Sequence, residues 1–299
     1  MKILFILVLL VSPAWASDTV PVVVPFSAGG ATDQAWRALL PYLNHELRPQ
    51  RISLVTEYLP GAGGSLGAAA VARRREASLL FTSASLVMAT VTTDSAGYDI
   101  GSFRLAGYAG YFPLVLFGSA THVWSWTDLK QQCRRRSLIY GSSGIGSMTH
   151  VSTQHLLQQI ACKTTAVPYR SASQAIPDLV SGDLDLVMDH PTGLALSMMQ
   201  QGRIRPLVVL SDRKLDTMPT VPTVSQVGVV SDFRNWQILV ANPAMSPETL
   251  SLIQRAFLIV LSQPQPRRDL AQLGLVDMGN HVAEGFLHDQ RQRFLSILQ

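Results

Sequence analysis

Three glycine-rich stretches carry the residues best suited to chemistry in this sequence. They span 26–33, 60–67 and 140–150, and read F-S-A-G-G-A-T-D, P-G-A-G-G-S-L-G and Y-G-S-S-G-I-G-S-M-T-H. Each follows an apolar stretch and leads into a helical pattern, and none carries the lysine of a phosphate-binding P-loop. Because the first N–H groups of a helix lack partners within the helix and lie at its positive end, such a helix start can hold an anion. The repeated pattern indicates several backbone segments that converge on one negatively charged ligand.

The residue sets of common catalytic sites are missing. Gly61 to Gly67 comes close to a dinucleotide fingerprint, but no acidic residue follows about 20 positions later at the end of a strand. G-S-S-G-I at 141–145 lacks the last glycine of a nucleophile elbow. The seven histidines are dispersed without H-x-x-x-H spacing, which argues against a catalytic zinc. We therefore expect a binding protein without a cofactor or metal, with an exported hydrolase using Ser143 as a remote alternative.

Length and composition narrow the class of protein. The chain has 299 residues, of which 47% are hydrophobic and 15% charged, and this length predicts two α/β lobes of roughly 100 to 150 residues each. The formal net charge is +4, and the basic residues are scattered apart from the triplets at 73–75 and 134–136. Both triplets lie beside expected helix ends without interleaved aromatic residues, so we do not expect nucleic acid as a partner.

The first residues have the pattern of a secretory signal. Lys2 precedes an apolar stretch over 3–11, and residues 14–16 read A-W-A. We expect a signal peptide over 1–16 and a soluble, exported, monomeric protein that begins at Ser17. No later stretch has the about 18 uninterrupted apolar residues of a membrane helix. In an oxidising compartment Cys133 and Cys162, the only cysteines, form a disulfide or else remain as two buried thiols.

Strand ends place further candidates beside the glycine-rich stretches. Residues 79–85 read as a strand whose end carries Ser83 and Ser85, and open α/β sheets bind ligands at such carboxyl ends. Capping of the next helix is the alternative role for either serine. Residues 105–117 are compatible with one strand, and residues 121–126 have the composition of a crossover out of the first lobe.

The strand expected over 183–189 ends in Asp189. This carboxylate either faces a cleft, where it would bind a ligand ammonium or hydroxyl, or serves as a capping or hinge residue. Asp183 and Asp185 are expected to face solvent. His150 lies in the first turn of a helix and either contacts the ligand or is a satisfied, half-buried histidine. The full set of candidate ligand-binding residues is Phe26, Ser27, Ala28, Gly29, Gly30, Ala31, Asp33, Ser83, Ser85, Ser142, Ser143, Gly146, Ser147, His150 and Asp189.

These motifs resemble those of one family. The matching stretches are V-P-F-S-A-G-G-A-T-D at 24–33, P-G-A-G-G-S-L-G at 60–67, Y-D at 98–99, Y-G-S-S-G-I-G-S-M-T-H at 140–150, V-P-Y at 167–169 and V-P-T at 221–223, with Gly228 and Trp236. In order and spacing they resemble the Bug family of periplasmic solute-binding proteins, the receptors of tripartite tricarboxylate transporters. Tyr58 and Ser171 depart from the family pattern, which commonly has asparagine and glycine there.

The resemblance implies a fold, a ligand class and partners. The fold is the two-lobed α/β fold of periplasmic binding proteins, type II-like, with a mixed sheet flanked by helices in each lobe. Lobe 1 would comprise 17–119 and 235–299, and lobe 2 would comprise 120–234. A small carboxylate would be held between the loops at 26–33 and 142–150, and the partner would be the membrane permease of such a transporter. The ectodomain of a membrane sensor kinase is the alternative partner.

Overall fold

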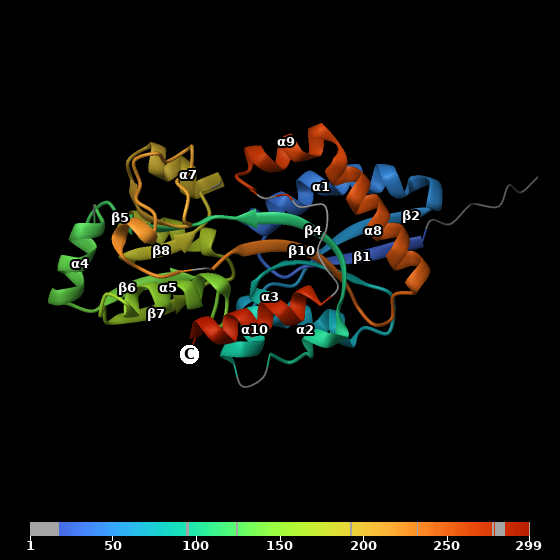
Figure 1. Cartoon of the computed structure of the whole chain (residues 1–299), viewed down its shortest axis with the longest axis horizontal. Coiled ribbons are helices and arrows are strands. Elements are labelled where there is room, and N and C mark those ends of the chain that lie inside the picture. Colours follow the sequence, from blue (N-terminus) through green and yellow to red (C-terminus); the bar gives the residue numbers. More distant parts are fainter. Residues whose placement is uncertain are drawn as a thin grey trace, which may run out of the picture.

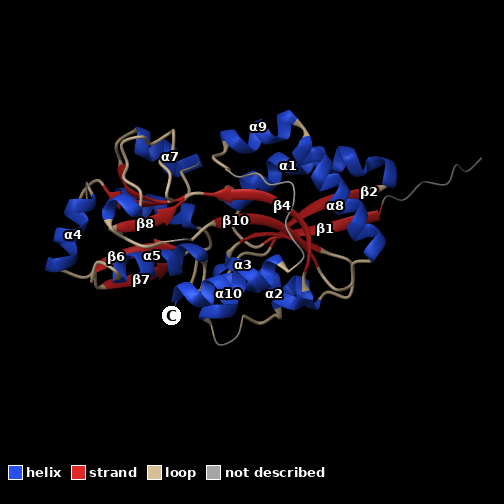
Figure 2. Ribbon diagram, viewed as in Figure 1, coloured by secondary structure: helices blue, strands red, loops and turns tan. Residues whose placement is uncertain are grey.

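A computed structural model describes residues 18–93, 96–123, 125–191, 193–231, 233–276, 278 and 285–298. The expected signal peptide, 1–16, and the expected first mature residue, Ser17, lie outside these ranges. Two separate five-stranded mixed sheets form the centres of two lobes that lie side by side (Figure 1). Helices flank each sheet (Figure 2), so the predicted two-lobed α/β fold is confirmed.

The first sheet has the strand order β2-β1-β3-β10-β4. Its strands are β1 (Asp18–Val24), β2 (Ile52–Tyr58), β3 (Leu79–Ser83), β4 (Arg104–Phe112) and β10 (Asn235–Ala241). β1 pairs in parallel with β2 and β3, whereas β10 runs antiparallel to β3 and β4. β1 is buried on both faces because Val22 and Val24 join one core cluster while Val23 joins another, which explains its run of β-branched residues.

The second sheet has the strand order β7-β6-β8-β5-β9. Its strands are β5 (Leu114–Ser119), β6 (Leu138–Ser142), β7 (Thr164–Pro168), β8 (Leu186–Asp189) and β9 (Ile204–Leu210). β6 pairs in parallel with β7 and β8, and β5 runs antiparallel to β8 and β9. The carboxyl ends of β6 and β8 therefore lie at one edge of this sheet.

The helices cover both faces of each sheet. Those of the first lobe are α1 (Ala31–Leu47), α2 (Ser65–Arg73), α3 (Ser85–Thr92), α8 (Pro247–Ser262), α9 (Pro264–Gln272) and α10 (Phe286–Leu298). Those of the second lobe are α4 (Trp126–Arg135), α5 (Met148–Gln158), α6 (Ile176–Ser181) and α7 (Gly193–Gln200), and short 3-10 helices include η2 (Ala62–Gly64) and η4 (Ala172–Ala175). α1 and α8 share a core cluster on one face of the first sheet, while α2, α3 and α10 belong to the cluster on the other face.

The chain passes between the lobes earlier than the sequence predicted. The single strand expected over 105–117 is two strands, β4 and β5, which are separated by Pro113 and belong to different sheets. The change of sheet comes one strand before the predicted lobe boundary at 119/120, because β5 pairs with β8 and β9 of the second sheet. The crossover lies at Pro113, not at 121–126. A proline cannot donate a hydrogen bond to a sheet, so it suits a point where the chain leaves one sheet for another.

Two local features stabilise the second lobe. Cys133 of α4 and Cys162 form a disulfide, the first of the two alternatives expected for them. The prediction that Asp185 faces solvent is wrong. Its side chain is buried and accepts hydrogen bonds from both Arg136 terminal nitrogens and from the Ile139 N–H. The guanidinium group satisfies the carboxylate, which explains why a charge in an alternating strand pattern can point inward.

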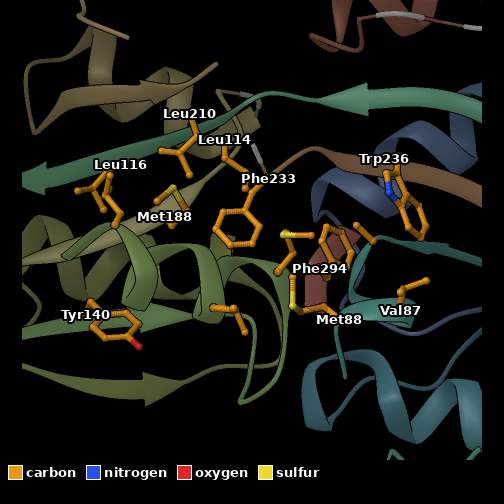
Figure 3. Packing of buried hydrophobic residues seen from close by; sticks show 14 of the residues in the cluster. Val87, Met88, Leu114, Leu116, Tyr140, Met188, Leu210, Phe233, Trp236 and Phe294 are labelled. Atoms are coloured by element: carbon orange, nitrogen blue, oxygen red, sulfur yellow. The ribbon is translucent and has the colours of Figure 1, made fainter. Parts of the chain in front are cut away.

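Aromatic side chains fill the junction between the lobes. Phe233 precedes β10, and its ring centroid lies 5.3 Å from that of His155 on α5 and 6.3 Å from that of Phe294 on α10. Figure 3 shows Phe233 and Phe294 between side chains of the second lobe, such as Met188, and those of the first lobe, such as Val87. One buried cluster therefore runs through both lobes and positions their facing edges.

Candidate functional site

Asp33 organises the first glycine-rich loop. It is fully buried, and its two carboxylate oxygens accept hydrogen bonds from the Gly29 N–H at 2.7 Å and from the Tyr58 hydroxyl at 2.7 Å. The prediction that Asp33 contacts the ligand and that Gly29 donates to an anion therefore needs correction, because these two groups bind one another. Tyr58, which departs from the family pattern, supplies the second bond that holds the carboxylate in place.

The start of α1 remains open to an anion. Gly30 occupies the N-cap position, and no side chain caps the helix there. Gly30 and Ala31 are buried, whereas Ala28 is exposed and Ser27 is half-buried. The ring of Phe26 packs on the second glycine-rich loop, since a Cβ placed on Gly64 would lie 3.1 Å from it. The first N–H groups of α1 thus have positive potential behind them and, among the described residues, no capping side chain.

The second lobe reaches the start of α1 through Ser171. A Cβ placed on Gly30 would lie 3.6 Å from the Ser171 Cβ, across the junction between the lobes. Ser171 is buried and precedes η4. Sequence reasoning noted this serine only as a departure from a family glycine, although it follows the V-P-Y strand at the same edge of the sheet as Ser142. The structure therefore brings Ser171 opposite the uncapped helix start.

The start of α5 is already satisfied by protein groups. The Ser147 Oγ accepts the His150 N–H at 3.2 Å, and the Ser85 Oγ of the first lobe accepts the Met148 N–H at 3.0 Å. Both serines are buried. Ser85 thus acts as a cap, the alternative role expected for it, but for a helix of the opposite lobe rather than its own. Because both oxygens only accept in these two bonds, donation from the Ser85 and Ser147 hydroxyl groups to a ligand stays a prediction.

The rest of the third glycine-rich loop is also internally bonded. The Ser143 hydroxyl lies 2.8 Å from the Thr149 Oγ1, and the Gly146 N–H donates to His150 Nδ1 at 3.3 Å. Burial lowers the pKa of His150, whose ring stacks on Tyr140. His150 is half-buried and its Nδ1 is bonded within the loop, so contact with a ligand through Nε2 stays a prediction. Ser142 differs, because its buried Oγ has no hydrogen-bond partner among the described residues.

The second and third glycine-rich loops touch through their backbones. A Cβ placed on Gly63 would lie 2.9 Å from the Ile145 carbonyl oxygen and 3.0 Å from the Ser147 nitrogen. A Cβ placed on Gly144 would lie 2.5 Å from the Gly63 nitrogen. These distances leave no room for a side chain on either residue, so glycine permits the close approach of the two lobes.

A buried polar group lies at the junction near the end of β8. Asp189 accepts the His190 N–H at 2.8 Å and a hydrogen bond from the Ser173 hydroxyl at 3.3 Å. Burial raises the pKa of this carboxyl to about 7. Ser83, at the end of β3, is buried and accepts the Ser85 N–H at 3.3 Å. Asp189 and Ser83 are the last residues of β8 and β3, so each lies at the carboxyl end of a strand, as the sequence predicted.

The described residues show neither a metal centre nor a membrane span. No group of three or more histidine, cysteine, aspartate or glutamate side chains among them could hold a metal ion. Their helices also include none with the length and apolar character needed to cross a bilayer. What the lobe junction offers is an uncapped helix start, hydroxyl groups and buried polar side chains, which suit non-covalent binding of a small polar solute.

The fold and the junction define a class: a two-lobed α/β binding protein whose lobes meet around a polar site. The chain belongs to the family described as tripartite tricarboxylate transporter family receptor, which matches residues 50–299. This confirms the resemblance to the Bug family. The family consists of solute-binding receptors and not of enzymes, and its members are periplasmic binding proteins.

Individual relatives agree with this assignment. A UPF0065 protein from the TAR-I ttuE-ttuC' intergenic region of Agrobacterium vitis is 28% identical over 93% of this chain and 81% of its own length. The protein BugT of Bordetella pertussis is 24% identical over 95% of this chain and 91% of its own length.

Solved structures share the fold. The periplasmic binding protein BugD superimposes with a TM-score of 0.86 at 22% identity, covering 94% of this chain and 96% of BugD. MatC of Rhodopseudomonas palustris with bound malate superimposes with a TM-score of 0.85 at 22% identity, covering 94% of this chain and 99% of MatC. The protein Rpa4515 of R. palustris with adipate superimposes with a TM-score of 0.84 at 23% identity, covering 95% of this chain and 97% of Rpa4515.

Proposed function

We propose that this receptor binds a small carboxylate between its lobes and delivers it to the membrane permease of a tripartite tricarboxylate transporter. The observation that carries the proposal is the uncapped start of α1 at Gly30, which lies opposite Ser171 of the second lobe. A carboxylate there would accept hydrogen bonds from backbone N–H groups at the positive end of a 17-residue helix. No cationic side chain is needed for this arrangement.

The ligand class is supported by the neighbours as well as by the site. MatC holds malate and Rpa4515 holds adipate, and both ligands are dicarboxylates. In the present chain, Ser142 and Ser171 would add hydroxyl groups from the second lobe. Binding from both lobes at once would couple ligand capture to lobe closure.

Binding is tested by calorimetry and thermal shift on the chain from Ser17 onward. Succinate, malate, citrate and adipate are the probes, with the matching amines and alcohols as uncharged or cationic controls. A carboxylate at 100 times its dissociation constant should stabilise the protein by about 2.7 kcal/mol. The proposal fails if no carboxylate raises the melting temperature while the protein is folded by circular dichroism.

Export through the signal peptide is part of the proposal. The disulfide between Cys133 and Cys162 fits an oxidising compartment. Fractionation of a bacterium that expresses the full chain should recover the protein in the periplasm, with Ser17 as the first residue by N-terminal sequencing. Recovery of uncut protein from the cytoplasm would contradict this part.

A further inference from the structure

Three polar side chains are buried together where the chain crosses between the lobes. Asn235 and Gln237 belong to β10, and His190 directly follows β8. Their exposed fractions are 4%, 0% and 5%. Polar side chains this deeply buried nearly always have hydrogen-bond partners, so each of their nitrogen and oxygen atoms needs an assigned partner.

The proton positions on His190 follow from its neighbours. Its Nδ1 lies 3.3 Å from the Pro113 carbonyl oxygen, and a carbonyl oxygen can only accept, so Nδ1 carries the hydrogen. Burial lowers the pKa of His190 to about 4, which keeps the ring neutral. Nε2 is then an acceptor, and the atom 2.9 Å away must be the Asn235 amide nitrogen. This orientation leaves the Asn235 Oδ1 free to accept.

The Gln237 amide is oriented in the same way. Its Nε2 donates to the Asn235 backbone oxygen at 3.2 Å. The Gln237 Oε1 is therefore the amide atom that still needs a hydrogen-bond donor. Among the described residues neither the Asn235 Oδ1 nor the Gln237 Oε1 has a hydrogen-bond partner. The junction therefore holds two buried acceptors that lack donors, which is an unfavourable arrangement for the protein alone.

Both acceptors lie on the face of the first sheet that carries α1. Residues two apart on a strand point to the same face, so Asn235, Gln237 and Leu239 share one side of β10, and Leu239 packs in the core cluster of α1. Gln237 is the cross-strand partner of Ser83, at the carboxyl end of β3. Asp189 directly precedes His190 and accepts its backbone N–H.

We propose that the Asn235 and Gln237 side-chain oxygens form an acceptor pole that selects carboxylates bearing an amine or hydroxyl group. This inference rests on the proposed function and specifies the ligand class of the same site. The carboxylate would lie at the start of α1, and the ammonium or hydroxyl hydrogens would satisfy the two amide oxygens. A dicarboxylate without a donor would leave both oxygens buried and unpaired, which disfavours it.

The test compares acids that differ by one donor. Dissociation constants are measured by calorimetry for succinate, malate and aspartate, and for glutarate, 2-hydroxyglutarate and glutamate. We expect at least one hydroxy or amino acid to bind about tenfold or more tightly than the plain acid of its series. The malate and aspartate arms also distinguish a hydroxyl from an ammonium group as the preferred donor.

Replacement of one acceptor assigns the effect to the pole. Gln237→Met keeps the length of the side chain and removes its amide. Because the Asn235 Oδ1 remains as an acceptor, the substitution should lower the ratio between the affinities of the donor-bearing and plain acids severalfold without abolishing it. Gln254→Met is the matched control. Gln254 lies on α8, away from the pole, and its side-chain amide also donates to a backbone oxygen, that of Leu105 at 2.8 Å. This control should leave the ratio unchanged.

The outcomes separate the two claims. If plain acids bind as tightly as donor-bearing ones in the unsubstituted protein, the acceptor pole is wrong and carboxylate binding stands. If the ratio is large and unchanged in folded Gln237→Met, the selection lies elsewhere and the inference is also wrong. If no acid of either kind binds, the proposed function fails, and the inference fails with it.

Discussion

The Ser85 hydroxyl caps a helix of the opposite lobe by accepting the Met148 N–H at 3.0 Å. Ser85 is the first residue of α3 in the first lobe, and Met148 is the first residue of α5 in the second. Helix caps are ordinarily local, so this bond forms only where the two lobes are together. It links the stability of a helix start to the closed arrangement of the protein.

Ser85→Ala should therefore weaken ligand binding. Loss of a helix cap costs about 1 kcal/mol, and here the loss falls on the closed state, so affinity should fall about fivefold. Ser246→Ala is the matched control, because Ser246 caps α8 within the first lobe by accepting the Thr249 N–H. It should lower the free energy of unfolding without changing affinity. Equal affinities for Ser85→Ala and the unsubstituted protein, measured by calorimetry, would show that the bond does not contribute to closure.

Gly63→Ala should hold the lobes apart. The added methyl group would meet backbone atoms of 145 and 147, which cannot rotate away, so we expect affinity to fall about tenfold or more. Gly228→Ala separates this effect from backbone strain, because Gly228 has a similar φ of 74° against 64° but has nothing within 4 Å of the added Cβ. Small-angle X-ray scattering should show a larger radius of gyration for Gly63→Ala alone. Identical scattering and affinity for both variants would contradict the contact.

Tyr58→Phe should loosen the first glycine-rich loop. The Tyr58 hydroxyl donates to Asp33, which in turn holds the Gly29 N–H. Tyr58 is exposed to solvent, so the bond contributes about 1 kcal/mol at most, and affinity should fall severalfold. Tyr42→Phe removes a similar tyrosine–aspartate bond, to Asp269, away from the site. Calorimetry on both variants checks the prediction, which is wrong if Tyr42→Phe weakens binding as much as Tyr58→Phe.

Much of the site followed from local patterns in the sequence. The buried strand over 20–24 and the glycine-rich turns at 29–30, 63–64 and 144–146 were recognisable because β-branched runs and paired glycines restrict the backbone directly. The strand end at Asp189 was recognisable from the alternation of apolar and acidic residues over 183–189. These patterns identified both the α/β fold and the edge of each sheet at which the lobes meet.

Contacts between distant parts of the chain were not recognisable. A serine at a helix start indicates a cap, but the sequence does not show that Ser85 caps α5, which begins 63 positions later. The strand pattern around β5 likewise says nothing of its pairing with β8 and β9. The missing donor of Gln237 is likewise visible only when its burial is known, since the stretch W-Q-I-L-V at 236–240 shows only one polar residue in an apolar strand pattern.

Asp189 and His190 should affect the pH dependence of stability in opposite directions. Burial raises the pKa of Asp189 from its ordinary 3.8 to about 7, so the folded protein keeps a proton that the unfolded chain loses, and stability from this group is lost as pH rises through that range. Burial lowers the pKa of His190 from 6.5 to about 4. The unfolded chain then gains a proton that the folded protein rejects, so stability from this group is lost as pH falls through that range. The two effects offset one another where the ranges overlap.

Asp189→Asn should expose the contribution of His190. Without the carboxyl group, the free energy of unfolding should fall more steeply than in the unsubstituted protein as pH is lowered from about 6.5 to about 4, by up to about 1.4 kcal/mol per pH unit. Urea denaturation across this range measures the difference between the two proteins, in which the other titrating groups cancel. Parallel curves would show that Asp189 does not hold a proton in the folded state.

The central claim is that a carboxylate binds at the start of α1, between the lobes. A crystal structure of the protein grown with the tightest-binding acid from the calorimetric series tests it most directly. We predict a ligand carboxylate within hydrogen-bond distance of the backbone N–H groups of Ala31 and Thr32 and close to Ser171, with Gly63 and Gly144 in contact. A carboxylate bound elsewhere, or one bound at the junction by side chains alone with the start of α1 unoccupied, would contradict the account.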